Sequence, residues 1–128
     1  MTRPTRTVSG FNGGLAAAGA VVAALAIGLS AWASHGLQPG REQHNVLMAC
    51  VFAFGHGVSW LALVPQAHGR LWRAGLGLQA LGVLLFCGSL VGNAVAGMPT
   101  AAAPAGGIAL MAGWLLLAVA VSGGVGRR

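Results

Sequence analysis

A histidine within an apolar run is the residue of this sequence best suited to chemistry. The segment "VFAFGHGVSW", Val51 to Trp60, places His56 among phenylalanine, valine and glycine. Histidine serves as a general base, a proton relay or a metal ligand because its ring changes charge near neutral pH. Few other polar residues lie within the apolar runs of the chain, and they include Ser30, Ser59, Gln79, Ser89 and Asn93.

The elements that must position these residues are four apolar segments. They cover about 13–33, 46–65, 74–97 and 102–122, and a helix needs about 20 residues to span a hydrocarbon core. Only 6% of the 128 residues are charged, whereas soluble domains carry about a quarter. The sequence therefore predicts an all-α integral membrane protein, in which residues 1–128 form a single domain. We expect its four transmembrane helices to form a compact bundle in the lipid bilayer.

The arginines predict how this bundle is oriented. Six of the seven lie where the chain ends or where the second and third segments are joined, and the positive-inside rule places such residues in the cytoplasm. We therefore expect both termini to be cytoplasmic (N-in/C-in), in a multi-pass protein of the bacterial inner (plasma) membrane. Nucleic acid is not an expected partner, because these arginines lie in pairs at segment ends rather than on one folded face. The six residues are Arg3, Arg6, Arg70, Arg73, Arg127 and Arg128.

A signal peptide is the alternative interpretation of the N-terminal segment. Arg3 and Arg6 precede an apolar run that ends in "AWA", Ala31 to Ala33, which has the form of a cleavage site. The run from Leu15 to Ala31 is longer than the usual apolar region of about 7–15 residues in such peptides. We therefore favour a retained transmembrane helix.

Small residues at four-residue spacing predict how the helices pack. Helices in lipid associate through close backbone approach, which requires glycine, alanine or serine at the contact. Trp60 and Trp114 lie deep in their segments, so each indole N–H needs a hydrogen-bond acceptor inside the bundle. The predicted packing residues are Ala16, Ala20, Ala24 and Gly28 in the first segment, Ala49, Ala53 and Gly57 in the second, Gly88 and Gly92 in the third, and Ala105, Gly106, Gly107, Ala109 and Gly113 in the fourth.

His56 is predicted to lie near the bilayer midplane, on a face that contacts other helices. A rise of 1.5 Å per residue puts it about 15 Å from Val46, and helical spacing puts it on the same face as Ala49 and Ala53. Burial disfavours the charged ring, so we expect a neutral histidine with one donor and one acceptor. Its expected partners are Ser59 and Ser89, with Ser30 nearer the outer face.

Two interpretations of His56 remain open, a structural hydrogen bond between helices and a proton relay or ligand site. We favour the structural one because no segment contains a carboxylate to complete a relay. No metal or cofactor is expected, because His35 and His44 lie at the outer side without a third ligand. Cys50 and Cys87 are interpreted as small buried apolar residues.

The chain resembles domain-of-unknown-function family 423, the YgdD-like membrane proteins, over nearly its whole length. The resemblance implies four transmembrane helices and no established activity, and it gives His35 and His56 as the first residues to test. The family's Tyr-Gln pair before the second histidine is Phe52 and Ala53 here, so this chain is a divergent member. The resemblance rests on His56 and on three blocks, "LSAWASHGL" (Leu29 to Leu37), "LFCGSL" (Leu85 to Leu90) and "PAGGIALMAGW" (Pro104 to Trp114).

The sequence thus predicts a non-enzymatic membrane protein with a structural or interaction role, whose partner is either another membrane protein or a second copy. The alternative is a small oligomeric transporter or channel component. Small exporters couple protons through a membrane-embedded glutamate, whereas Glu42, the chain's one acidic residue, lies between the first two segments.

Overall fold

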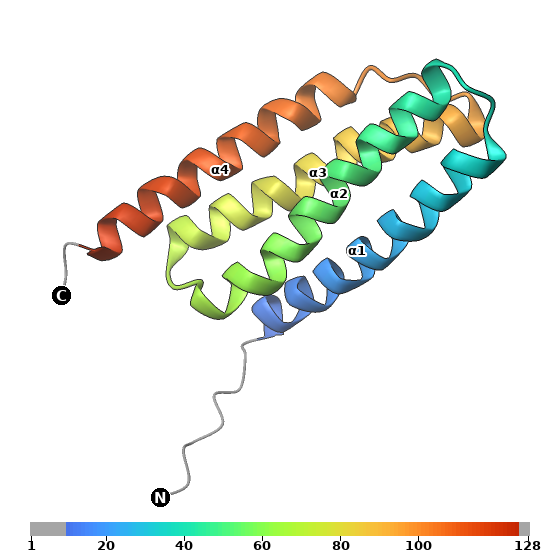
Figure 1. The fold of residues 1–128 in the computed structure, drawn as a ribbon. Helices are drawn as coiled ribbons and strands as arrows, with labels where there is room; N and C mark the ends of the chain where they lie inside the picture. The colour runs from blue at the N-terminus through green and yellow to red at the C-terminus, as the bar shows by residue number, and fades with distance from the viewer. Residues whose placement is uncertain (1–9, 126–128) are drawn as a thin grey trace, which may run out of the picture.

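The computed structural model describes residues 10–125, and these form four long helices (Figure 1). All four are long and apolar enough to cross a membrane, which confirms the predicted all-α membrane fold. Arg3, Arg6, Arg127 and Arg128 lie outside the described residues. The helices are α1 (Gly10–Gly36), α2 (Arg41–Leu63), α3 (Arg70–Ala96) and α4 (Ala103–Val125), with a short 3-10 helix, η1 (Val64–Gln66), after α2.

Helices form here because the bilayer offers no water to the peptide groups, so each N–H and C=O must be satisfied within its own segment. The helices extend a few residues beyond most of the apolar runs. Glycine is required where two of the turns bend, because Gly69 (φ 87°) and Gly97 (φ 64°) adopt left-handed backbone conformations. Gly97 N donates to the carbonyl of Asn93 at 2.9 Å, and the side-chain amide of Asn93 donates to the Met98 carbonyl at 2.7 Å.

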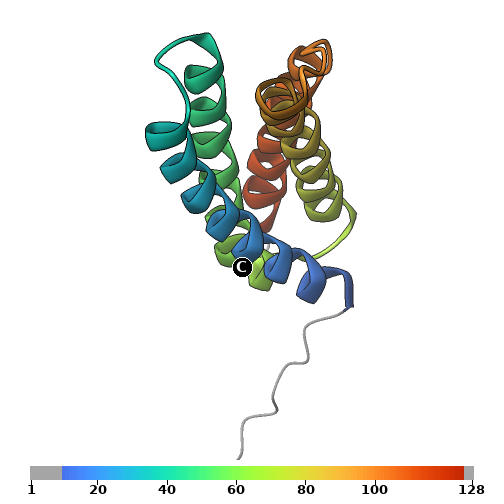
Figure 2. The same ribbon diagram turned by 90° about the vertical axis from the view of Figure 1, so that its right-hand side faces the viewer.

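The four helices lie in serial order as two antiparallel hairpins. Helices α1 and α2 form one hairpin, α3 and α4 form the other, and α2 packs against α3 to join them. Within the described residues, no Cα atom of α4 approaches α1 or α2 within 8 Å, nor does α1 approach α3. Figure 2 shows the hairpins close together near the α2–α3 connection and diverging toward the α1–α2 and α3–α4 turns. The helices pack compactly within each hairpin, and grooves remain between them.

The α3–α4 hairpin is held by glycines spaced seven residues apart. A methyl group added at Gly113 would lie 2.8 Å from the carbonyl oxygen of Gly75, and one at Gly82 would lie 2.9 Å from that of Gly106. Contacts this short leave no room for a side chain, so the two backbones touch directly. The second hairpin therefore depends on glycine at these four positions.

The α1–α2 hairpin has a similar contact at Gly19 and Gly57. A methyl group at Gly19 would lie 2.5 Å from the carbonyl oxygen of Gly57. The buried face of α1 continues through Ala23, Ala26 and Ala33. The backbones of α1 and α2 therefore also meet without intervening side chains.

Several predicted packing residues lie at helix contacts and others do not. Ala49, Ala53, Gly57, Gly106 and Gly113 are buried or packed against the core, as predicted.

The predictions for Gly88 and Gly107 are wrong, because an added methyl group at either would meet nothing within 4 Å. Gly92 faces only Met98 of the following turn, and Ala20, Ala24 and Gly28 are exposed. Four-residue spacing identifies faces made of small residues, but these helices carry more than one such face. The spacing therefore does not identify the packed one.

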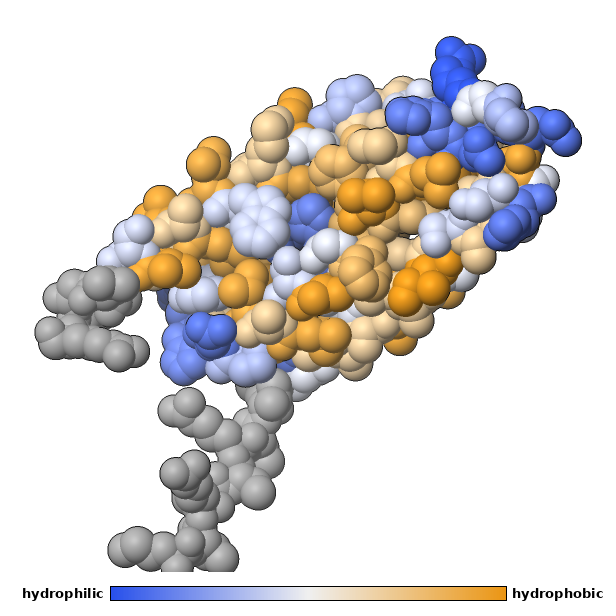
Figure 3. Space-filling model, in the orientation of Figure 1, coloured by the Kyte–Doolittle hydropathy of each residue, from blue (hydrophilic) through white to orange (hydrophobic). Residues whose placement is uncertain are grey.

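The outer surface is apolar between two polar ends. Figure 3 shows apolar side chains over most of one face, with most hydrophilic residues gathered toward the two ends of the helices and one small hydrophilic spot near the middle. The exposed side chains include Leu25, Leu84 and Leu115. Exposure of such residues at the middle of long helices is expected for a protein whose solvent is lipid.

Candidate functional site

His56 bridges the two hairpins through its ring. It lies on α2 and is only 7% exposed. Its Nε2 accepts a hydrogen bond from the indole Nε1 of Trp114 on α4 at 3.0 Å, and its Nδ1 lies 2.7 Å from the carbonyl oxygen of Phe52. The predicted interhelical hydrogen bond is therefore present, and it joins two helices whose backbones do not touch.

The two partners fix the protonation state of the ring. An indole N–H can only donate, so Nε2 of His56 must be an unprotonated acceptor. A carbonyl oxygen can only accept, so Nδ1 must carry the proton and donate it to Phe52. The ring is thus a neutral Nδ1–H tautomer, with both nitrogens in use. This arrangement leaves no free lone pair for metal binding or proton abstraction.

An aromatic groove surrounds the ring. The Phe52 and His56 rings stack at 6.4 Å, Phe86 of α3 lies 5.0 Å from Phe52, and Trp114 lies 5.8 Å from His56, all between centroids. The cavity beside them has a volume of about 310 Å³. We call it the aromatic groove, and it is lined by Phe52, His56, Phe86, Pro104, Gly107, Ile108, Leu110, Met111 and Trp114.

A second polar pair ties α2 to α3. The indole Nε1 of Trp60 donates to Oε1 of Gln79 at 3.1 Å, and Gln79 is completely buried. The Gln79 amide nitrogen has no hydrogen-bond partner among the described residues. Its side chain lies against Gly113 of α4, where an added methyl group would be 2.7 Å from Cγ of Gln79. Both deep tryptophans therefore find the acceptors that the sequence required.

The serines predicted as partners of His56 are not its partners. Ser59 donates to the Gly55 carbonyl at 2.7 Å, Ser89 to the Phe86 carbonyl at 3.1 Å, and Ser30 to the Ile27 carbonyl at 2.8 Å. Each hydroxyl is satisfied by the preceding turn of its own helix, as is common for serine inside helices. His35 is exposed in the last turn of α1 and is not part of the site.

The sequence does contain a signal for the true hydrogen-bond partners of His56 and Gln79, which are tryptophans. Trp60 and Trp114 are donors only, and each required an acceptor at depth. Besides the hydroxyls, His56 and Gln79 are the deepest side-chain acceptors in the four segments. Pairing the two indoles with these two acceptors, rather than with serines, would have given the contacts that the structure contains.

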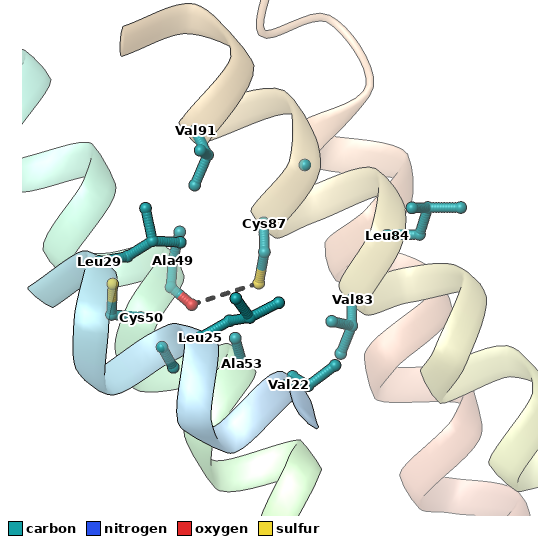
Figure 4. A pocket seen from close by; sticks show the side chains of 12 residues that line it. Val22, Leu25, Leu29, Ala49, Cys50, Ala53, Val83, Leu84, Cys87 and Val91 are labelled. Atoms are coloured by element: carbon teal, nitrogen blue, oxygen red, sulfur yellow. Dashed lines mark hydrogen bonds between the residues drawn. The ribbon is translucent and has the colours of Figure 1, made fainter. Parts of the chain in front are cut away.

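The cysteines line a second groove, between α1, α2 and α3. Both thiols are free and buried. Cys87 points toward α2 and its thiol donates to the Ala49 carbonyl at 3.3 Å (Figure 4). We call this cavity of about 250 Å³ the cysteine groove; it is lined by Val22, Leu25, Ala26, Leu29, Ala49, Cys50, Ala53, Val83, Leu84, Cys87, Gly88 and Val91.

Comparison with known proteins does not assign the chain to a family. No model of a known protein family matches the chain, and no solved structure matches it. The resemblance to domain-of-unknown-function family 423 stays a prediction. The geometry of the two hairpins and their grooves is therefore what indicates a function.

Proposed function

We propose that this protein is a non-enzymatic component of the bacterial inner membrane that acts by binding another membrane protein or a second copy of itself. The observation that carries this proposal is the serial order of the helices, in which, among the described residues, the backbones of α1 and α4 each approach only one other long helix. Both bury a smaller share of their residues than α2 and α3 do. Two grooves run between the hairpins, and both are lined almost entirely by apolar side chains.

The chemistry of the polar residues supports an interaction role over catalysis. The nitrogens of His56 are both engaged in hydrogen bonds, and Glu42, the one acidic residue, lies in the first turn of α2. General acid–base and nucleophilic mechanisms need a group whose proton or lone pair is available to a substrate. Helices that meet through glycine and alanine suit a scaffold that presents lipid-facing surfaces to a partner.

The orientation and family are part of the same proposal. Arg70 and Arg73 lie in the first turn of α3, at the end of the bundle where α1 begins and α4 ends (Figure 1). The positive-inside rule supports a cytoplasmic location for that end. The order of the three sequence blocks and His56 along the chain supports divergent membership of domain-of-unknown-function family 423.

Site-specific photocrosslinking in native membranes tests the interaction role. A photoreactive residue at Leu84, in the cysteine groove, is compared with one at Leu115 of α4, because both leucines are 69% exposed but only Leu84 lines that groove. We expect a protein adduct at Leu84 that also copurifies in mild detergent, and mainly lipid adducts at Leu115. Lipid adducts alone at both positions would contradict the proposal.

The transporter alternative predicts a different result. A transporter would show substrate-dependent proton flux in liposomes, and His56→Ala would abolish it. We expect no such flux, because the groove beside His56 is almost wholly apolar and His56 is engaged in a structural contact.

A further inference from the structure

The first turn of α3 carries two exposed positive charges at one end of the bundle. Arg70 and Arg73 are both exposed there, and residues three apart in a helix are neighbours on its surface. The two guanidinium groups therefore extend from the same side of α3. The chain's one acidic side chain, Glu42, does not neutralise them, because it lies in the first turn of α2 at the opposite end (Figure 1).

An apolar strip continues from these arginines along the outer face of α3. With 3.6 residues per turn, Gly77 and Leu81 lie on the same face as Arg70 and Arg73. Leu81 is 48% exposed, and a methyl group added at Gly77 would meet nothing within 4 Å. Neither residue lines the aromatic groove or the cysteine groove. This part of α3 is therefore an open apolar surface with a pair of positive charges at its end.

The strip has the depth of one bilayer leaflet. Half of a hydrocarbon core is about 15 Å thick, and about ten residues of helix cover that depth. Trp72, which packs against the core while remaining partly exposed, marks the headgroup level, because tryptophan prefers the interface. An acyl chain that starts beside Arg73 thus passes Gly77 and Leu81 before it reaches the middle of the membrane.

We propose that this face of α3 binds a phospholipid with a negatively charged headgroup, such as phosphatidylglycerol. The guanidinium groups of Arg70 and Arg73 donate charge-assisted hydrogen bonds to the phosphate oxygens, and one acyl chain lies along Gly77 and Leu81. Basic residues next to a transmembrane helix attract anionic lipids. The headgroup of phosphatidylethanolamine binds less well, because its ammonium group is repelled by the arginines. This lipid site does not depend on the protein partner proposed above.

Lipid titration of the full chain in mild detergent tests the site. Native mass spectrometry counts the bound lipids as phosphatidylglycerol or phosphatidylethanolamine with the same acyl chains is added. We expect tighter binding of phosphatidylglycerol. Arg70→Gln/Arg73→Gln should weaken that binding about 25-fold, because each basic residue near an anionic lipid contributes about fivefold. Equal binding of the two lipids by the parent chain, or unchanged binding by the variant, would overturn the proposal.

A matched variant distinguishes this site from a general effect of charge. Arg127→Gln/Arg128→Gln also removes two positive charges, but these follow α4 in the sequence and do not belong to α3. It should bind phosphatidylglycerol within about twofold of the parent chain, whereas a loss equal to that of the α3 variant would contradict a site on α3. If Arg70→Gln/Arg73→Gln does not fold, the two single variants replace it, each with an expected loss of about fivefold.

Two soluble competitors distinguish a lipid from a free anion. Inorganic phosphate and glycerophosphoglycerol, which is the same headgroup without acyl chains, carry the charge but cannot cover the apolar strip. At the concentration of the bound lipid, neither should displace phosphatidylglycerol. Displacement by either one would show that the arginines bind an anion without any contribution from Gly77 and Leu81, and this would overturn the proposal of a lipid site.

Discussion

The indole nitrogen of Trp114 lies 3.0 Å from Nε2 of His56, and this bond connects α4 to α2 although their backbones do not meet. His56 therefore stabilises the packing of the two hairpins. Side-chain hydrogen bonds inside membrane proteins contribute about 0.6 kcal/mol on average and about 1.7 kcal/mol at most.

A double-mutant cycle measures this contribution. His56→Leu leaves the indole N–H of Trp114 unpaired, and Trp114→Phe removes the donor, so each single variant should unfold more easily in detergent. We expect a coupling energy of about 0.5–1.5 kcal/mol between them. If His56→Leu keeps full thermal stability but abolishes a transport or binding activity, the structural role assigned to His56 is wrong.

The backbone contact between α3 and α4 predicts that the stability of the protein depends strongly on glycine at that contact. Gly113→Ala places a methyl group 2.8 Å from the Gly75 carbonyl and against Gln79, and overpacking of this kind costs about 1–3 kcal/mol.

Gly107→Ala, six residues earlier on α4, is the matched control because its methyl group meets nothing within 4 Å. Thermal unfolding in detergent should show a large loss for the first variant and little change for the second. Equal losses would show that α3 and α4 do not meet as described.

The hydrogen bond between Trp60 and Gln79 predicts that replacing both residues destabilises the protein no more than replacing Gln79 alone. Gln79→Leu removes the unpartnered amide nitrogen but also leaves the Trp60 indole without its acceptor. An unsatisfied buried donor costs about 1–3 kcal/mol, whereas replacing both partners with apolar groups can be nearly neutral. The double variant Trp60→Phe/Gln79→Leu should therefore be at least as stable as Gln79→Leu alone in denaturant unfolding. A further loss in the double variant would argue against this pairing.

The arginine distribution predicts the orientation of the chain. A reporter enzyme active only outside the cytoplasm should be inactive when fused to the C-terminus and active when inserted at Thr100, in the α3–α4 turn. Replacing Arg70 and Arg73 with glutamine should weaken this preference, because arginines near helix ends set topology. Strong activity from the C-terminal fusion would contradict this prediction, because it would show that the C-terminus lies outside the cytoplasm.

The spans could be predicted from the sequence because lipid imposes a length and a composition on them. A helix about 20 residues long with almost no charge is readable from hydropathy alone. The helix ends were harder to predict, because hydrogen bonding carries a helix beyond its apolar core. Helix α2, for example, begins at Arg41, directly after Gly40 and five residues before its apolar run.

The contacts between helices were less predictable, for a physical reason. Periodicity gives the face on which a residue lies, and depth gives the residues at the same level. Neither gives the order of helices around the bundle. The sequence predicts a buried His56 that bonds another helix, which the structure confirms, but it indicates Ser89 of α3 where the partner is Trp114 of α4. Likewise, Gly75 and Gly82 could not be distinguished from Gly88, because all three are glycines on one helix.

The bond between α2 and α4 requires that Nε2 of His56 carry no proton. Solid-state NMR of the ¹⁵N-histidine-labelled protein in bilayers, with His35, His44 and His68 replaced by glutamine, isolates the signals of the one remaining ring. At about pH 7.5 we expect a neutral imidazole with its proton on Nδ1 and an unprotonated Nε2, because the Trp114 indole N–H can only donate and the Phe52 carbonyl can only accept. An imidazolium, or a proton on Nε2, would contradict it, because neither form can accept the Trp114 hydrogen bond that joins the hairpins.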